Sequence, residues 1–313
     1  MRQLTFRGPG KLQWEDVVAP RLTGEGDSAG AALVRPLAVA TCDLDAAMVS
    51  GAAPLPGPFA FGHEFVAEVA EVADGVGSVC PGDRVIVPFQ VSCGTCERCR
   101  RGLTGSCATA GAGAAFGMAP IARRDWGGAL SDLVLVPFAD AMLVPLPPGA
   151  DPATFASVSD NVPDGWRSVA PARASDPGAP VLVVGGSGDV ALYAAAVAVA
   201  LGSPHVDYVD TDERRLRVAE SVGANPAVFD LENPIDRQRL SNPMRALGAL
   251  EGMFAEGVEQ SVKDAVYAAA KLFQTRKRAT LIALAFPDTA TFRDYVGGIQ
   301  KALDRLRGSS DAR

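Results

Sequence analysis

Short apolar runs alternate with turn residues over the first 150 positions. We expect strands at residues 65–72, 83–89, 129–137 and 141–144, because each run has the length of a strand and lies between glycine or proline residues. No long helical pattern interrupts them. A series of short strands of this kind is typical of a small, mostly antiparallel β-barrel.

From residue 151 onward, the pattern changes to strands that alternate with helices. The expected helices span residues 152–157, 166–170, 190–201, 212–222 and 260–273. The expected strands span residues 181–184, 206–210, 227–229, 252–255 and 280–286. This alternation predicts an α/β domain with a doubly wound parallel sheet.

The final segment has a pattern of its own. Residues 292–307 place apolar side chains on one stripe and charged side chains opposite, which indicates an amphipathic helix. We therefore expect a barrel domain at residues 1–150, an α/β domain at 151–289 and a C-terminal amphipathic helix at 290–313.

Composition narrows the class of protein. With 48% hydrophobic and 21% charged residues, the chain resembles a globular protein and not a disordered one. Its net charge of -7 has the wrong sign for phosphate neutralisation, so we expect no nucleic-acid partner.

The apolar run at 181–201 is broken by glycines, so a strand, a turn and a helix explain it better than a membrane span does. The first residues lack the apolar core of a signal peptide, so we expect a reducing, cytoplasmic setting.

Four of the six cysteines lie in one short segment. Cys93, Cys96, Cys99 and Cys107 have the spacing of a tetrahedral zinc site, in which each sulfur lies about 2.3 Å from the ion. An iron–sulfur cluster and an unmetallated disulfide knot are the alternatives. A site closed by four thiolates has no open position, so we expect the zinc to be structural.

A glycine-rich turn links the first strand and helix of the α/β domain. Gly186, Gly188 and Ala191 match the G-x-G-x-x-G/A form of the dinucleotide fingerprint. Asp210 ends the next expected strand, where a carboxylate can accept hydrogen bonds from the adenosine ribose. The acids around Asp210 disfavour a 2′-phosphate, whereas Arg214 and Arg215 would favour one, so we expect NAD in preference to NADP. A glycine-rich turn that binds no nucleotide is the alternative.

Three further residues are candidates for a functional site because of their order along the chain. Cys42, His63 and Asp160 could singly be a buried thiol, a core histidine and a helix cap. Together with the cysteine cluster and the glycine-rich turn, their order resembles the zinc-dependent medium-chain alcohol dehydrogenase family. The resemblance covers about residues 1–225. It implies a GroES-like β-barrel catalytic domain and a Rossmann domain.

The resemblance also implies roles for individual residues. Cys42, His63 and Asp160 match the three protein ligands of a catalytic zinc, which leaves one position for water or the substrate oxygen. Glu64 matches a position thought to visit the metal during ligand exchange, and Asp45 matches a carboxylate that orients the His63 ring.

The implied chemistry is hydride transfer between a small alcohol and NAD. Zinc acts as a Lewis acid that lowers the pKa of the alcohol, and the carbonyl product is an aldehyde or ketone. Val190 matches a position that backs the nicotinamide, and Arg215 matches one that meets the adenosine ribose. Two zinc ions per chain, one catalytic and one structural, and NAD are the expected cofactors.

The sequence departs from the family in two places. Leu44 and Ala47 stand where a hydroxyl and a histidine commonly form a proton relay, so proton release would run through water, Asp45 or Glu64. The C-terminal region is short or divergent where the family completes its barrel domain and forms its usual dimer interface. A homo-oligomer is compatible with the resemblance, but this interface is not expected in its usual form.

Two other functions compete with the alcohol dehydrogenase hypothesis. A degenerate relative would keep the structural zinc and nucleotide binding without catalysis, which Leu44 and the C-terminal region favour. A zinc-ribbon protein that binds nucleic acid is supported by the cysteine segment alone and opposed by the net charge.

Overall fold

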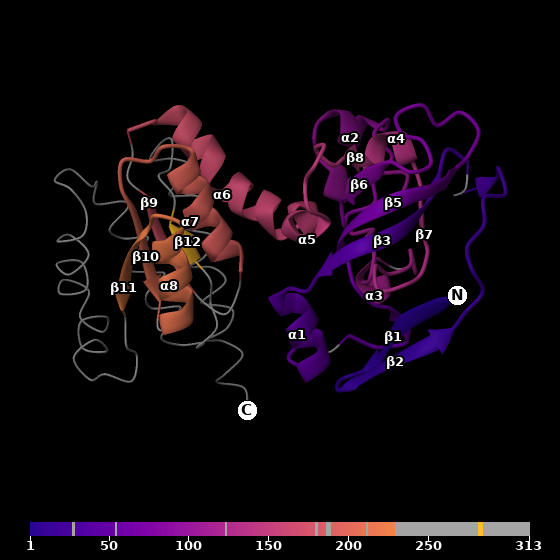
Figure 1. The fold of residues 1–313 in the computed structure, drawn as a ribbon, viewed down its shortest axis with the longest axis horizontal. Coiled ribbons are helices and arrows are strands. Elements are labelled where there is room, and N and C mark those ends of the chain that lie inside the picture. Colours follow the sequence, from indigo (N-terminus) through magenta and orange to yellow (C-terminus); the bar gives the residue numbers. More distant parts are fainter. Residues whose placement is uncertain are drawn as a thin grey trace, which may run out of the picture. The chain divides into compact units, whose positions relative to one another are not determined.

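The computed structural model describes residues 1–26, 29–53, 55–122, 124–178, 181–185, 189–210, 212–228 and 281–283. The chain divides into two compact units, Met1–Asn161 and Val162–Arg313. Figure 1 shows their elements. The helices expected at 260–273 and 292–307, the strand expected at 252–255, and Gly186 and Gly188 lie outside the described residues.

The first unit is built from antiparallel strands. They are β1 (Arg2–Gly8), β2 (Lys11–Asp16), β3 (Ala32–Ala40), β4 (Phe59–Ala60), β5 (Glu64–Val72), β6 (Arg84–Val87), β7 (Val134–Val136) and β8 (Val144–Pro145). One sheet has the order β2-β1-β4 and the other the order β7-β3-β5-β6-β8. Every pairing in both sheets is antiparallel, as the apolar pattern predicted.

The longest pairing of this unit involves a strand that the apolar pattern did not reveal. β3 pairs with β5 from Ala32 to Ala40, with register shifts between Leu33 and Val34 and between Pro36 and Ala38. Proline is tolerated in a strand at such irregularities, since it has no N–H to donate. The proline therefore interrupts the sequence pattern without ending the strand.

Short helices occupy the connections of the first unit. They are α1 (Asp43–Ser50), α2 (Glu97–Arg100), α3 (Ala119–Ala122), α4 (Ala139–Met142), α5 (Pro152–Phe155) and the 3₁₀ turns η2 (Thr104–Ser106) and η3 (Ala156–Ser159).

The strand expected at 141–144 is wrong over most of its length. Phe138, in the left-handed region with φ 52°, precedes a helical turn that forms α4, and strand structure resumes only at Val144. Backbone hydrogen bonds from Ala141 and Met142 to the Phe138 carbonyl close this turn. The helical turn after Phe138 therefore forms in place of the strand that the apolar residues predicted.

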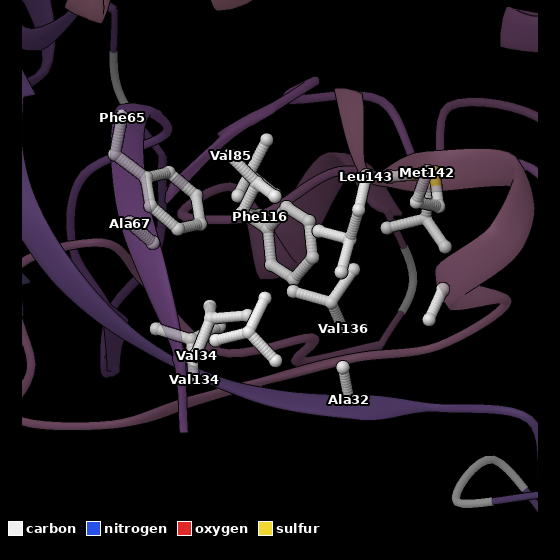
Figure 2. Close-up of a cluster of buried hydrophobic side chains, with 14 of the residues drawn as sticks. Ala32, Val34, Phe65, Ala67, Val85, Phe116, Val134, Val136, Met142 and Leu143 are labelled. Carbon is white, nitrogen blue, oxygen red and sulfur yellow. The ribbon is translucent and has the colours of Figure 1, made fainter. Parts of the chain in front are cut away.

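The main core of the first unit lies against the five-stranded sheet. Figure 2 shows Phe65, Phe116 and surrounding aliphatic side chains in this cluster. The rings of Phe65 and Phe116 are edge to face at an interplanar angle of 86°, with centroids 5.8 Å apart. Since Phe65 lies two residues after His63, this packing fixes the start of β5 and the residues that precede it.

Two backbone segments pass very close to the chain that leads into His63. A Cβ on Gly117 would lie 2.5 Å from the Gly62 carbonyl oxygen, and one on Gly128 would lie 2.5 Å from the Phe61 carbonyl oxygen. Only glycine allows backbones to approach this closely. The close packing therefore holds the His63 backbone rigidly.

The second unit alternates strands and helices. Its elements are α6 (Asn161–Ser175), which begins at the last residue of the first unit, β9 (Val181–Val184), α7 (Val190–Ala200), β10 (Val206–Asp210), α8 (Glu213–Ser221), β11 (Asn225–Val228) and β12 (Leu281–Ala283). The sheet order is β11-β10-β9-β12.

Three of these strands form the expected parallel sheet. β10 pairs in parallel with β9 and with β11. β12 pairs antiparallel with β9, whereas the sequence predicted a parallel strand there. The free edge of a strand accepts a neighbour in either direction, because both kinds of ladder use the same backbone groups.

Helices α7 and α8 cover this sheet with small side chains. Val183 and Tyr208 of the sheet are buried in one cluster with Ala191, Ala195 and Ala198 of α7. Alanine at these positions lets α7 pack against β9 and β10. Within the part of the chain that the structure describes, no helix has the length and apolarity needed to cross a bilayer.

The close approach at Gly128 predicts a specific loss of stability. We expect Gly128→Ala to lower the free energy of unfolding by about 2 kcal/mol, because the new methyl group meets backbone that cannot move aside. Gly77→Ala is the matched control, since a Cβ there meets nothing within 4 Å. Urea unfolding of both variants tests this, and equal midpoints would contradict it.

Candidate metal centres

Cys42 is positioned by the start of a helix. It is the N-cap residue of α1, and its backbone N–H donates to Asp45 Oδ2 at 3.0 Å. This capping box fixes both residues at the first turn of the helix. The Cys42 side chain is buried and its Sγ lies 3.4 Å from His63 Nε2.

Asp160 is positioned by a turn attached to the barrel. It follows η3, and the preceding Ser159 hydroxyl accepts a hydrogen bond from the Phe65 N–H at 3.0 Å while donating to the Ala156 carbonyl at 2.7 Å. This serine fastens the turn to the beginning of β5. A residue far along the chain is thereby brought beside His63.

The distances among these side chains fit a tetrahedral ion. His63 Nε2 lies 3.4 Å from Cys42 Sγ and 3.4 Å from Asp160 Oδ2. Ligand atoms about 2.0–2.3 Å from a tetrahedral zinc are about 3.3–3.6 Å apart for such N, O and S pairs. With Glu64, they form a buried set whose ligand atoms all lie within 4.8 Å of one another. The structure therefore brings Cys42, His63 and Asp160, which the family resemblance implies as ligands, together with Glu64 in one buried cluster.

The electrostatics of this cluster favour a cation. Burial acts to lower the pKa of His63, yet hydrogen bonding to Asp160, Asp45 and Cys42 raises it to about 12. Burial and the nearby Asp160 charge raise the pKa of Glu64 to about 7, against the opposing effect of His63. Acidic groups buried this closely are stabilised by positive charge among them, which a proton or a metal dication supplies.

Asp45 faces the other nitrogen of the imidazole. Its Oδ1 lies 3.4 Å from His63 Nδ1, and neither of these buried atoms has a hydrogen-bond partner elsewhere. A carboxylate at this place favours the tautomer with the proton on Nδ1, which leaves Nε2 free to bind a metal. The family resemblance implies the same role for Asp45.

The four clustered cysteines form a second candidate site. Cys93, Cys99 and Cys107 are buried, Cys96 is half-buried, and all four Sγ atoms lie within 4.8 Å of one another. Cys96 Sγ and Cys107 Sγ are 4.0 Å apart, close to the value of about 3.8 Å expected for two thiolates on one zinc. The six cysteines are free of disulfides, which excludes a disulfide knot in this structure.

Backbone amides surround these sulfurs. The N–H groups of Cys96, Cys99 and Ala110 donate to the Sγ atoms of Cys93, Cys96 and Cys107 respectively. Although burial acts to raise the pKa of Cys93, hydrogen bonds from Thr109 and from the Cys96 N–H lower it, whereas burial and the neighbouring thiols raise the pKa of Cys99. Donors aimed at sulfur stabilise thiolates, which are the form that binds zinc.

The acid expected to meet the ribose lies at the carboxyl end of β10. Asp210 is buried, its Oδ2 accepts from Tyr208 Oη at 2.9 Å and from Arg215 Nε at 2.7 Å, and its Oδ1 accepts from Arg215 Nη2 at 2.7 Å. A Cβ on Gly185 would lie 2.2 Å from Asp210 Oδ2, so only glycine fits at the end of β9. Val190 begins α7, at the helix N-terminus that follows the glycine-rich turn.

Sequence reasoning missed two residues of these sites. Tyr208 bonds to Asp210, and burial with the Asp210 charge raises the pKa of its phenol. Asn161 donates to Glu64 Oε1 at 2.9 Å. Tyr208 and Asn161 each lie within two residues of a predicted site residue. This proximity along the chain was the only indication of a role, and it does not reveal which side chains are in contact.

The comparisons with known proteins agree with this architecture. Residues 28–148 match the family model of the alcohol dehydrogenase GroES-like domain. Glutathione-independent formaldehyde dehydrogenase of Pseudomonas aeruginosa is 33% identical over 248 residues, which cover 76% of this chain and 61% of that protein. Medium chain reductase/dehydrogenase ucsI of Acremonium sp. is 32% identical over 231 residues, which cover 72% of this chain and 75% of that protein.

Solved structures give the same result for the fold. Alcohol dehydrogenase TADH from Thermus sp. ATN1 matches with a TM-score of 0.66 at 32% identity, covering 77% of this chain and 67% of that one. A cobalt- and zinc-bound thermostable alcohol dehydrogenase from Pyrobaculum aerophilum matches with a TM-score of 0.59 at 28% identity, covering 73% and 65% of the two chains.

The family-model match and the similarity to a dehydrogenase structure agree with an architecture of a GroES-like barrel and a Rossmann-type α/β sheet. The chain belongs to the zinc-type medium-chain alcohol dehydrogenase family. The resemblance drawn from the sequence, and with it the α/β fold class, is confirmed. The chain spans about three fifths of the length of the first curated relative that it matches.

The contact between Asp45 and His63 predicts a loss of metal affinity. We expect Asp45→Asn to weaken zinc binding at the His63 site about tenfold, because a neutral amide orients the ring less strongly than a carboxylate does. Competition with a chelator of known affinity measures the change. Asp43→Asn, which alters an exposed acid in the same helical turn, serves as the control and should retain the affinity of the unaltered protein.

Proposed function

We propose that this protein is a zinc-dependent oxidoreductase that transfers a hydride between a small alcohol and NAD. The observation that carries the proposal is the pair of 3.4 Å distances from His63 Nε2 to Cys42 Sγ and to Asp160 Oδ2. Three ligands at tetrahedral spacing are typical of a catalytic zinc, since a structural zinc has four.

The donor set suits the chemistry. Thiolate, imidazole and carboxylate would hold the ion, which when bound polarises the oxygen of an alcohol or carbonyl substrate. Asp45 would orient His63 through Nδ1, and burial of the whole cluster would strengthen each electrostatic interaction within it. The four-cysteine site would hold a second zinc with a structural role.

Proton release requires a route other than the usual relay. Leu44 packs against the apolar cluster that contains Phe6 and Met48, so it acts as a packing residue where relatives commonly have a hydroxyl. The acids beside the site are Asp45 and Glu64, both of which are buried. We propose that the proton leaves through water or through one of these carboxylates.

The nucleotide would be recognised at the end of β10. Asp210 lies beside Gly185, whose lack of a side chain leaves room next to the carboxylate. Both carboxylate oxygens already accept hydrogen bonds from Arg215, so ribose hydroxyls would share or take over these positions. A negative carboxylate at this place disfavours a 2′-phosphate, which supports NAD as the cofactor.

Metal content tests the proposed function directly. We expect two zinc ions per chain in the purified protein and NADH formation with a member of a panel of small alcohols. Asp160→Ala should lose one zinc ion and the alcohol-dependent NADH formation together, because Cys42 and His63 alone hold zinc poorly while Glu64 stays hydrogen-bonded to Asn161. Asp151→Ala, which removes the N-cap of α5, should keep both metals. One zinc ion or none in the unaltered protein would contradict the catalytic assignment.

Nucleotide affinity tests the second unit independently. We expect Asp210→Asn to raise the dissociation constant for NADH about tenfold, because hydrogen bonds to a charged acceptor are lost. Fluorescence titration of bound NADH measures this without any turnover. Asp207→Asn is the control, since strand alternation places residue 207 on the opposite face of β10. Equal dissociation constants for the two variants would argue against ribose recognition by Asp210.

A further inference from the structure

Glu64 occupies an unusual environment beside the three proposed ligands. It is fully buried, and its Oε1 accepts a hydrogen bond from Asn161 Nδ2 at 2.9 Å. Its Oε2 is buried without a hydrogen-bond partner. A buried carboxylate oxygen that lacks a donor is stabilised by a nearby cation, so Glu64 competes for the same ion as its neighbours.

The distances separate Glu64 from the other ligands. His63 Nε2 lies 3.4 Å from Asp160 Oδ2 and 3.9 Å from Glu64 Oε1. The first distance matches two atoms bound to one tetrahedral zinc, whereas the second exceeds the expected value of about 3.3–3.6 Å. Glu64 therefore belongs to the cluster, but its distance from His63 Nε2 is too long for both atoms to bind one tetrahedral ion. The distance from Asp160 Oδ2 to His63 Nε2 is short enough.

The hydrogen bond from Asn161 lies on the atom that would have to move. Asn161 is itself buried and begins α6 directly after Asp160. The same short segment thus carries the proposed ligand Asp160 and the amide of Asn161, which donates a hydrogen bond to the Glu64 carboxylate. A hydrogen bond to an ionised carboxylate is stronger than one between neutral groups, and it would have to break before Glu64 Oε1 could move toward the ion.

We propose that Asn161 is a positioning residue that restrains Glu64 at the edge of the metal site and so keeps the fourth coordination position open to an incoming ligand. This proposal rests on the proposed function, because it assumes a metal ion held by Cys42, His63 and Asp160. It assigns to Asn161 control over how readily Glu64 closes that site.

Azide binding to the cobalt-substituted, full-length protein tests the restraint without turnover. Cobalt(II) replaces zinc, and its visible absorption changes when azide enters an open coordination position. We expect Asn161→Leu to weaken azide binding about tenfold, the scale set by one hydrogen bond to a charged group, because the released Glu64 takes the open position. Cobalt should also leave this variant more slowly when a chelator is added.

Further variants separate the restraint from a general loosening of the segment. Asn161→Asp has nearly the same shape but no amide donor, so it should weaken azide binding in the same direction. Ser168→Ala removes a hydrogen bond within α6, from the Ser168 hydroxyl to the Asp164 carbonyl, that involves neither Glu64 nor a proposed ligand, and it should leave azide affinity unchanged. In a Glu64→Gln background, Asn161→Leu should have no further effect on azide binding.

The outcomes distinguish this proposal from the function on which it rests. If the unaltered protein takes up no cobalt at the His63 site, both proposals are wrong. If it binds azide and both Asn161 variants bind azide equally well or more tightly, Asn161 does not restrain Glu64 and the proposed function still stands. An equal loss of azide affinity in Ser168→Ala would also overturn the role of Asn161.

Discussion

The concentration of acidic groups around one imidazole is the constraint on which the barrel domain depends. Asp45, Glu64, Asp160 and Cys42 are all buried around His63. Carboxylates cannot be buried together without a cation or a proton among them, so this arrangement would destabilise a barrel that had no use for it. The surrounding structure is rigid where it holds the cluster: glycine contacts fix the chain before the histidine, and a helix cap fixes the thiol.

Different groups stabilise the negative charge at the two candidate metal sites. Around the four cysteines, backbone N–H groups of the same loop point at the sulfurs and spread the charge over many weak donors. Around His63, side chains from separate segments balance one another, and few backbone donors take part. The first arrangement is complete by itself, whereas the second leaves atoms such as Glu64 Oε2 without a partner. An incomplete set of partners is what a site that exchanges ligands requires.

The sequence predicted the elements whose patterns are local and uninterrupted. The strand at 206–210 and the helix starting at Val190 match the structure, because each is a continuous segment of suitable composition bounded by turn residues. β3 escaped prediction because Pro36 interrupts its pattern, and the expected strand at 141–144 was wrong because a left-handed Phe138 starts a turn. The proposed ligands were found through family order along the chain. Contacts such as that of Asn161 depend on long-range packing, which no local pattern encodes.

The separation of the ligands along the chain has a consequence for the order in which metals can be acquired. All four cysteines lie between residues 93 and 107, so closing their loop costs little chain entropy and requires only that segment. Cys42, His63 and Asp160 meet only after η3 has been fastened to β5 through Ser159. During synthesis, the cysteine loop could therefore bind a metal ion before the three proposed ligands of the other site have met. Starvation for zinc late in synthesis would leave chains that are folded and metallated at one site only.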